Sequence, residues 1–158
     1  MSRAFVKEDD DKGSEALPDR AISPHPNYVT AEGLAQIDVE LERLQVALAA
    51  AGDDRTQRTA IERDLRYWRA RRSTAEVVAP PNDSATVRFG STVTIARDDG
   101  REQTWRIVGE DEANPAAGTL SYVAPLAIAL TGKSVGDAVT VAGRDAEIVR
   151  IVDNLQPC

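Results

Sequence analysis

Two stretches with a helical repeat flank a short turn at residues 49–54. The repeating positions before the turn are Leu34, Ile37, Leu41, Leu44 and Leu48. Those after it are Ile61, Leu65, Trp68, Arg72 and Ala75. A repeat of about 3.5 residues keeps one stripe of a helix against a partner helix, and Gly52 lets the chain reverse. The pattern predicts an antiparallel two-helix coiled-coil hairpin over residues 29–79, with Thr30 as the first N-cap.

The second half of the chain, residues 86–153, has the shorter and alternating pattern of β-strands. The predicted strands are Thr86–Phe89, Thr92–Ala96, Thr104–Val108, Thr119–Val123, Ala138–Val141 and Glu147–Val152. Pro125 to Leu130 has the features of a short helix, with proline at its first position and Gly132 just beyond its end. Residues 80–85 form a proline-containing linker. We therefore expect an α+β protein, in which the hairpin precedes an antiparallel β domain with one short helix.

The two ends of the chain have different compositions from the rest. Residues 1–28 contain an acidic run at 8–11 and few apolar residues, so we expect a disordered acidic leader, and residues 154–158 form a short tail. No apolar run approaches the ~18 residues of a membrane span, and the first residues do not resemble a secretory signal. The single cysteine, Cys158, excludes an internal disulfide and suits a reducing cytoplasm.

Charge is distributed unevenly along the predicted hairpin. The net charge of −7 argues against a general nucleic-acid binder and against sequence-specific DNA binding. Residues 30–54 carry six acids and one arginine, whereas residues 55–72 carry seven arginines and two acids. Pairing of the two arms explains this asymmetry. Alternatively, the arginine-rich arm, Arg55–Arg72, contacts an acidic partner or RNA.

Candidate chemistry is sparse. The only histidine, His25, lies between two prolines and is a poor catalytic or metal-binding candidate. The acids at residues 110–112 follow a predicted strand, as is typical of a solvated loop. The turn of the hairpin carries Asp53 and Asp54, which offer two carboxylates at its free end. An aspartate at the start of a helix commonly serves as an N-cap, so both roles stay open for this pair.

Four motifs of the second half resemble a known family. They are Phe89-Gly90-Ser91-Thr92-Val93, Arg106–Ala113 (RIVGEDEA), Ser121–Leu130 (SYVAPLAIAL) and Gly132–Asp137 (GKSVGD). Their order and spacing resemble the FGxxV, RIVGxDEA, SPxARAL and GKxxGD elements of the bacterial GreA and GreB transcript-cleavage factors. The resemblance covers about residues 29–152 and implies a coiled coil followed by an FKBP-like domain.

The resemblance also implies a partner and a mechanism. The globular domain would bind RNA polymerase at the rim of its secondary channel. The residues implied in this contact are Asp111, Glu112, Ser121, Pro125, Leu126 and Leu130. The catalytic residues implied at the hairpin tip are Asp53 and Asp54, with a transient Mg²⁺ at Asp53 that is shared with the polymerase active site. The factor would thus be accessory to another enzyme and hold no cofactor of its own.

This sequence departs from the family pattern at the tip. The family has a second acid three residues beyond the aspartate, where this chain has Thr56. Each arm is also about ten residues shorter, which at ~1.5 Å per residue is roughly 15 Å of reach. The alternative function is therefore a non-cleaving secondary-channel regulator, similar to Rnk, that competes with true cleavage factors. A free-standing FKBP-like prolyl isomerase would need an aromatic-lined pocket, which the sequence does not supply.

Overall fold

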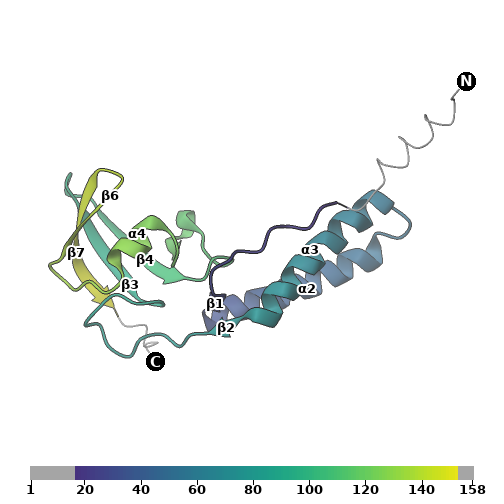
Figure 1. Ribbon diagram of the computed structural model, residues 1–158, viewed down its shortest axis with the longest axis horizontal. Coiled ribbons are helices and arrows are strands. Elements are labelled where there is room, and N and C mark those ends of the chain that lie inside the picture. Colours follow the sequence, from purple (N-terminus) through teal and green to yellow (C-terminus); the bar gives the residue numbers. More distant parts are fainter. Residues whose placement is uncertain (1–16, 153–158) are drawn as a thin grey trace, which may run out of the picture. The chain divides into compact units, whose positions relative to one another are not determined.

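The computed structural model describes residues 17–152, which fall into two compact units (Figure 1). Residues 17–24 and 37–74 belong to the first unit, and residues 25–36 and 75–152 belong to the second. The acidic run at 8–11 and the tail at 154–158 lie outside the described residues. The second unit thus takes residues from both sides of the hairpin, whereas the sequence predicted one boundary at residues 80–85.

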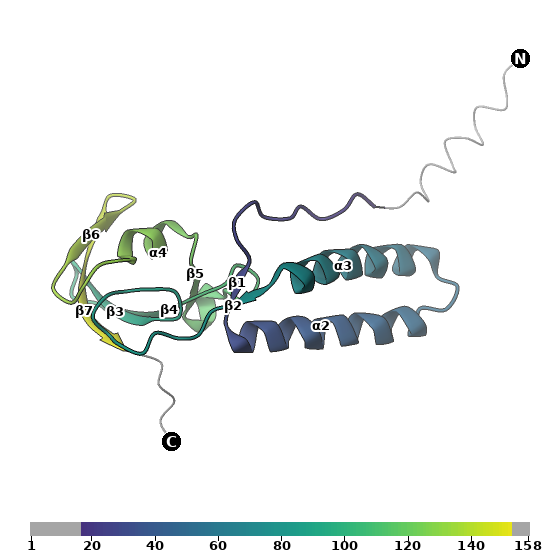
Figure 2. The same ribbon diagram turned by 60° about the horizontal axis from the view of Figure 1, so that its bottom comes forward.

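The first unit is built on two antiparallel helices, α2 (Ala31–Ala50) and α3 (Arg55–Thr74); the residues of α2 up to 36 belong to the second unit. They lie side by side in both ribbon views (Figures 1 and 2). Their core consists of the stripe residues Leu44, Ile61 and Leu65 together with Ala51. The predicted stripe differs at its last turn. Arg72, which the repeat placed on the stripe, is exposed and pairs with Asp38 at 2.7 Å, whereas its neighbour Arg71 is buried. The hairpin prediction is otherwise confirmed.

The second unit contains a five-stranded sheet in the order β5-β4-β3-β7-β6. The strands are β3 (Thr92–Arg97), β4 (Glu102–Val108), β5 (Thr119–Ser121), β6 (Ala138–Val141) and β7 (Arg144–Val152). All neighbours are antiparallel except β4 and β5, which are parallel. The wholly antiparallel prediction is corrected here, because the chain crosses over through the short helix η1 (Pro115–Ala117) instead of a hairpin turn.

The core of the sheet lies under the predicted short helix, α4 (Pro125–Leu130). Ala127 and Leu130 of this helix are fully buried with Ile95, Ile107 and Ile148 of the sheet. The predicted strand Thr86–Phe89 does not form. Val87 is buried nonetheless, because its backbone pairs with the segment after α4: its N–H donates to the Lys133 carbonyl at 2.9 Å, and its carbonyl accepts from Gly132 at 2.8 Å.

A short parallel strand pair, β1 (Tyr28–Val29) and β2 (Glu76–Val77), flanks the helices in sequence. Pairing of Glu76 and Val77 with β1 explains why α3 ends at Thr74, short of residue 79 where the predicted hairpin ends. The Tyr28 ring lies 6.1 Å from Phe89 and 5.4 Å from Tyr122, between ring centres. The predicted disorder is therefore corrected for residues 26–28, because strand pairing and ring contacts hold them. No helix in the described range is long and apolar enough to cross a membrane.

Candidate functional site

The hairpin tip is a tight turn that leads directly into α3. Gly52 adopts a φ of 59°, in the left-handed region that glycine favours. Asp54 then acts as the N-cap of α3, because its Oδ1 accepts the backbone N–H of Gln57 at 3.1 Å. The cap role that the sequence left open for Asp54 is thus present. One of its carboxylate oxygens is engaged in holding the helix.

Asp53 is the freer of the two tip carboxylates. Its side chain is exposed, and it has no hydrogen-bond or ion-pair partner within residues 17–152. Thr56, at the place where the family has its second acid, is also exposed. Mg²⁺ takes six oxygen ligands in an octahedron, so a cation at Asp53 would need most of its ligands from water or another molecule. The tip therefore suits an ion that a second molecule also coordinates better than an ion held by this protein alone.

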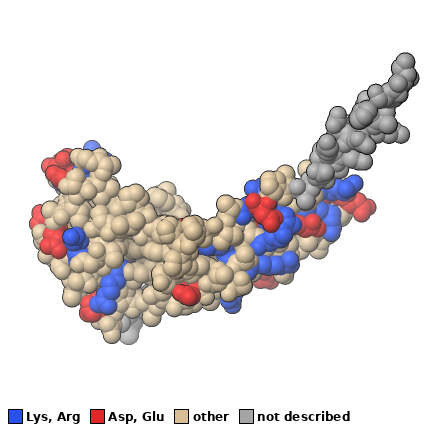
Figure 3. Space-filling model, viewed as in Figure 1, with Lys and Arg blue, Asp and Glu red and all other residues tan. Residues whose placement is uncertain are grey.

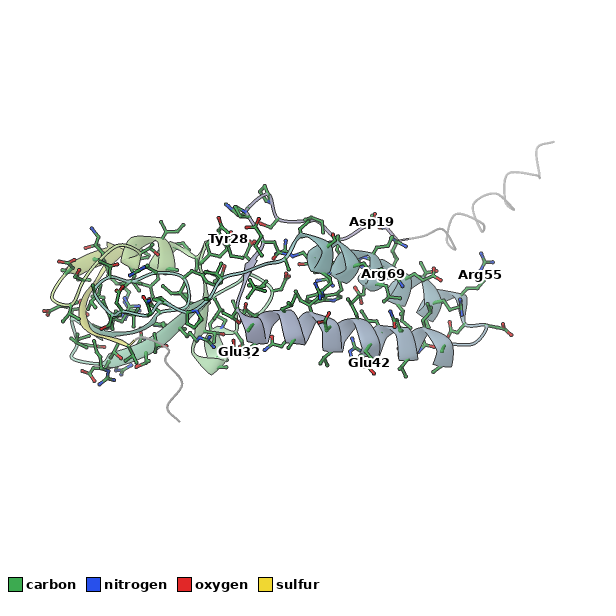
Figure 4. All side chains as sticks on the ribbon, turned by 90° about the horizontal axis from the view of Figure 1, so that it is seen from below. Asp19, Tyr28, Glu32, Glu42, Arg55 and Arg69 are labelled. Atoms are coloured by element: carbon green, nitrogen blue, oxygen red, sulfur yellow. The ribbon has the colours of Figure 1, made fainter. Side chains whose placement is uncertain are left out.

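Two arginines at the start of α3, Arg55 and Arg58, lie near the tip. Arg58 donates to the Gly52 carbonyl at 3.2 Å and lies 3.8 Å from Glu62. Figure 4 shows Arg55 at the loop end of the hairpin. Each helix has 20 residues and is therefore about 30 Å long at ~1.5 Å per residue. The tip thus presents one free carboxylate among arginines at the end of a short probe.

Glu112 has a structural role in the second unit. Its Oε2 accepts the backbone N–H of Thr30 at 2.9 Å, and its Oε1 accepts the Thr30 hydroxyl. Thr30 in turn accepts the N–H of Gly33 at 3.0 Å through its own hydroxyl oxygen. In a capping box, the residue three positions after the N-cap supplies the acid that accepts the N-cap N–H. That position is Gly33, so Glu112 supplies the acid from 82 residues away.

The Glu112 carboxylate and the Tyr28 backbone each occupy space that a side chain would need at a glycine. A Cβ on Gly33 would lie 2.2 Å from Glu112 Oε2, and one on Gly109 would lie 2.3 Å from the Tyr28 carbonyl oxygen. Sequence reasoning missed both contacts. A signal existed, because Thr30 is followed at the third position by glycine and not by the glutamate of a capping box.

The other residues predicted to contact RNA polymerase differ in how exposed they are. Leu130 is 0% exposed and belongs to the core, which corrects its assignment to a docking surface. Glu112 is turned toward Thr30, as described above. Pro125 is exposed, whereas Ser121, Leu126 and Asp111 are half-buried. On α4, Ile128 is also open to a partner, at 62% exposure.

A cleft of about 350 Å³ lies beside the start of α2, within the second unit. Val77, Val78 and Pro80 form its apolar walls, and Glu32 and Arg106 contribute charge. The Glu32 carboxyl accepts its own backbone N–H, which holds its pKa below the usual range; partial burial opposes this, and the Arg106 charge adds to it. Arg106 lies 3.5 Å from Glu32. Sequence analysis did not identify this cleft, because its walls come from separate segments.

Charge pairing within the first unit differs from the prediction. The two arms pair at Arg72 and Asp38, whereas Asp64 and Arg66 of α3 pair with residues 17–24, which the sequence assigned to a disordered leader. Figure 3 shows basic side chains gathered over the hairpin on the face in view. The segment that precedes the hairpin therefore pairs with one base and one acid of the arginine-rich arm and leaves its net charge unchanged.

Comparison with known proteins gives consistent results. The family model for "Transcription elongation factor, GreA/GreB, C-term" matches residues 81–153. The transcription elongation factor GreA of Chloroflexus aggregans is 38% identical over 142 residues, covering 76% of this chain and 90% of that protein. The transcription elongation factor GreB of Neisseria meningitidis serogroup B is 36% identical over 137 residues, covering 73% and 84% respectively.

Among solved structures, the GreA factor homologue 1 of Thermus thermophilus is 24% identical, with a TM-score of 0.40 over 81% of this chain and 99% of that one. The alignment with the Chloroflexus protein also reveals a difference in length. Because 76% of 158 residues is about 120, roughly twenty of the 142 aligned positions have no counterpart in this chain.

Proposed function

This chain belongs to the GreA/GreB family of transcription elongation factors, and on that premise we propose that it regulates elongation from the secondary channel of RNA polymerase. The β domain would dock at the rim of the channel, and the hairpin would extend into it. The factor would act in the bacterial cytoplasm as an accessory to the polymerase, without catalysing a reaction of its own. Its hairpin would occupy the channel with little or no stimulation of RNA cleavage.

The observation that carries the weak-cleavage proposal is the chemistry of the tip. Asp53 is the only tip carboxylate that is free at both oxygens, since Asp54 caps α3 through Oδ1, and Thr56 offers no charge. Two-metal hydrolysis requires a firmly held second ion. A single carboxylate among Arg55 and Arg58 would hold that ion weakly. The roughly twenty aligned positions of the Chloroflexus GreA without a counterpart here equal in number the roughly ten residues that each of the two arms is expected to lack.

A second function, stimulation of RNA cleavage, is favoured by one observation: the Asp53 carboxylate is exposed and has no partner within residues 17–152. A carboxylate in this position could complete the coordination of a Mg²⁺ shared with the polymerase and help orient a water molecule toward backtracked RNA. Arg55 and other exposed arginines of α3 would then lie close enough to contact the nascent RNA. The two functions share the docking of the β domain and differ in what the tip does.

Cleavage of RNA in a backtracked polymerase complex distinguishes the two functions. We would compare the wild type with Asp53→Asn and Asp54→Asn, and titrate a GreA cleavage factor in parallel. Glu42→Gln is the matched control, because Glu42 is an exposed acid on α2 away from the tip (Figure 4). We expect no cleavage above background, and loss of GreA-dependent cleavage as the protein is added.

The other outcomes have clear meanings. Cleavage that Asp53→Asn abolishes and Glu42→Gln preserves would establish a true cleavage factor and overturn the weak-cleavage proposal. Neither cleavage nor competition, together with no measurable binding to polymerase, would overturn both functions.

A further inference from the structure

Residues 17–24, here called the strap, lie along α3 in the first unit. Asp19 pairs with Arg66 at 2.6 Å, and Arg20 pairs with Asp64 at 3.2 Å. Figure 4 shows Asp19 beside α3. These two ion pairs join residues more than forty positions apart in sequence. The strap is therefore held at a defined place on the helix, although it forms no helix or strand of its own.

Arg20 makes the most specific contact. Its guanidinium carbon lies 3.9 Å from the centre of the Tyr67 ring and 5.8 Å from that of Trp68. The two rings meet edge to face, with centres 5.1 Å apart. Asp64 lies one turn before Trp68 and accepts from the same guanidinium. An acid combined with aromatic faces is the arrangement that recognises an arginine side chain.

Charge holds the strap more than apolar burial does. The two large apolar side chains of the strap, Leu17 and Ile22, are 41% and 47% exposed. The paired side chains of Arg20 and Asp64 are 35% and 39% exposed. Exposed ion pairs and cation–π contacts contribute about 1 kcal/mol or less each, and salt screens them. Such contacts hold a segment in place but allow it to detach.

We propose that Asp64, Tyr67 and Trp68 form an arginine-binding site on α3, and that the strap is its built-in ligand. With Arg20 bound, its guanidinium covers the Tyr67 ring beside Trp68, and the neighbouring Asp19 pairs with Arg66. Release of the strap exposes the face of Tyr67 that Arg20 covers and breaks both ion pairs, Arg20–Asp64 and Asp19–Arg66. The strap is thus a detachable, salt-sensitive cover of one arm of the hairpin.

Limited proteolysis with thermolysin tests the proposal on the full chain. Thermolysin cuts before large apolar residues, and the Ala21–Ile22 bond lies within the strap. We expect Arg20→Ala to raise the cleavage rate at this bond roughly tenfold, since it removes the ion pair and the ring contact together. Arg20→Lys keeps the charge but loses the flat guanidinium, so we expect about a threefold rise. Asp64→Asn and Tyr67→Leu should raise the rate to a similar extent as Arg20→Lys.

Two controls separate release of the strap from other effects. Glu42→Gln removes one negative charge from α2 without touching the strap and should leave the rate unchanged. The helical circular dichroism of Arg20→Ala should match that of the wild type.

Raising the salt concentration from about 50 mM to about 0.5 M should increase wild-type cleavage relative to that of Arg20→Ala, because screening weakens the contacts that the variant already lacks.

Three results would overturn the proposal. Equal cleavage in the wild type, Arg20→Ala and Asp64→Asn would mean that this site does not hold the strap. An equal rise in Glu42→Gln would indicate a general charge effect. Unfolding of the hairpin in Arg20→Ala would make the strap an obligatory part of the fold instead of a cover. The strap and its site lie within one unit, so this test needs no polymerase and its outcome is independent of the function proposed above.

Discussion

The Glu112 carboxylate occupies the space that a side chain at Gly33 would need: a Cβ on Gly33 would lie 2.2 Å from Glu112 Oε2. That carboxylate accepts the N–H of Thr30, the residue that caps α2. A loop after β4 therefore completes the cap of a helix that begins 82 residues earlier. The glycine that weakens the helix locally is the residue that makes this long-range cap possible.

Gly33→Ala should stabilise the protein in a Glu112→Ala background but not in the wild type. In the wild type it displaces the Glu112 carboxylate, and loss of the cap should cancel or exceed the gain of about 1 kcal/mol from alanine in a helix. In a Glu112→Ala background the space is empty, so the same change should stabilise the protein by about 1 kcal/mol. Urea denaturation of the four proteins measures the coupling. Additive effects would mean that the two residues do not compete for one space.

Acid should destabilise the protein partly through Glu32. The pKa of this carboxyl is lowered in the folded protein, chiefly by its own backbone N–H. A group with a lowered folded pKa stabilises the protein above its unfolded pKa, and this contribution is lost as the pH falls through the folded value. The wild type should therefore lose more stability than Glu32→Gln as the pH falls below about 4.5. Parallel profiles of unfolding free energy against pH for the two proteins would contradict this role.

Substitution of the two tip aspartates should change the free energy of unfolding by different amounts. Asp54→Ala removes the N-cap of α3 and should lower the free energy of unfolding by about 1 kcal/mol. Asp53→Ala removes an exposed carboxylate without a partner in the described chain and should change it by less than about 0.5 kcal/mol. Chemical denaturation followed by circular dichroism makes the comparison. Equal losses would place Asp53 in the structure of the turn and leave the tip without a free carboxylate.

Substitutions at two residues of α4 should distinguish an effect on polymerase binding from an effect on stability. Ile128 is 62% exposed, so Ile128→Glu should weaken polymerase binding by about tenfold, or about 1.4 kcal/mol, with little effect on stability. Leu130 is fully buried, so Leu130→Ala should lower the free energy of unfolding by about 2–5 kcal/mol. Fluorescence anisotropy with labelled protein measures binding, and urea denaturation measures stability. Unchanged polymerase binding by Ile128→Glu would exclude this face of α4 from the contact.

Local signals in the sequence were sufficient for several elements. Thr30 as the cap of α2, and the short helix from Pro125 with Gly132 beyond its end, are confirmed because capping residues act on backbone groups a few positions away. The paired helices are confirmed because a sustained apolar repeat needs only one partner of the same kind. The assignment to the GreA/GreB family is also confirmed, since short motifs kept their order and spacing.

The candidate site was predicted only in part, because most functional assignments depend on what lies opposite a residue. Asp53 and Asp54 were identified as the tip, but which of them is free depends on where α3 begins. Leu130 was assigned to the docking surface and Glu112 with it. The first is core and the second is a cap, and neither fact can be read from the neighbouring sequence.

The sequence by itself therefore determined the α+β class, the hairpin and the Thr30 cap of α2, since periodicity and capping act over a few residues. The tertiary structure decided the parallel direction of β5, the placement of the strap, and the pairing of Glu112 with Thr30. Each of these depends on partners that are distant in sequence, where neither spacing nor propensity specifies the match. The physical reason is that the role of a capping acid or a stacked arginine is set by its partner, and only the fold brings that partner into place.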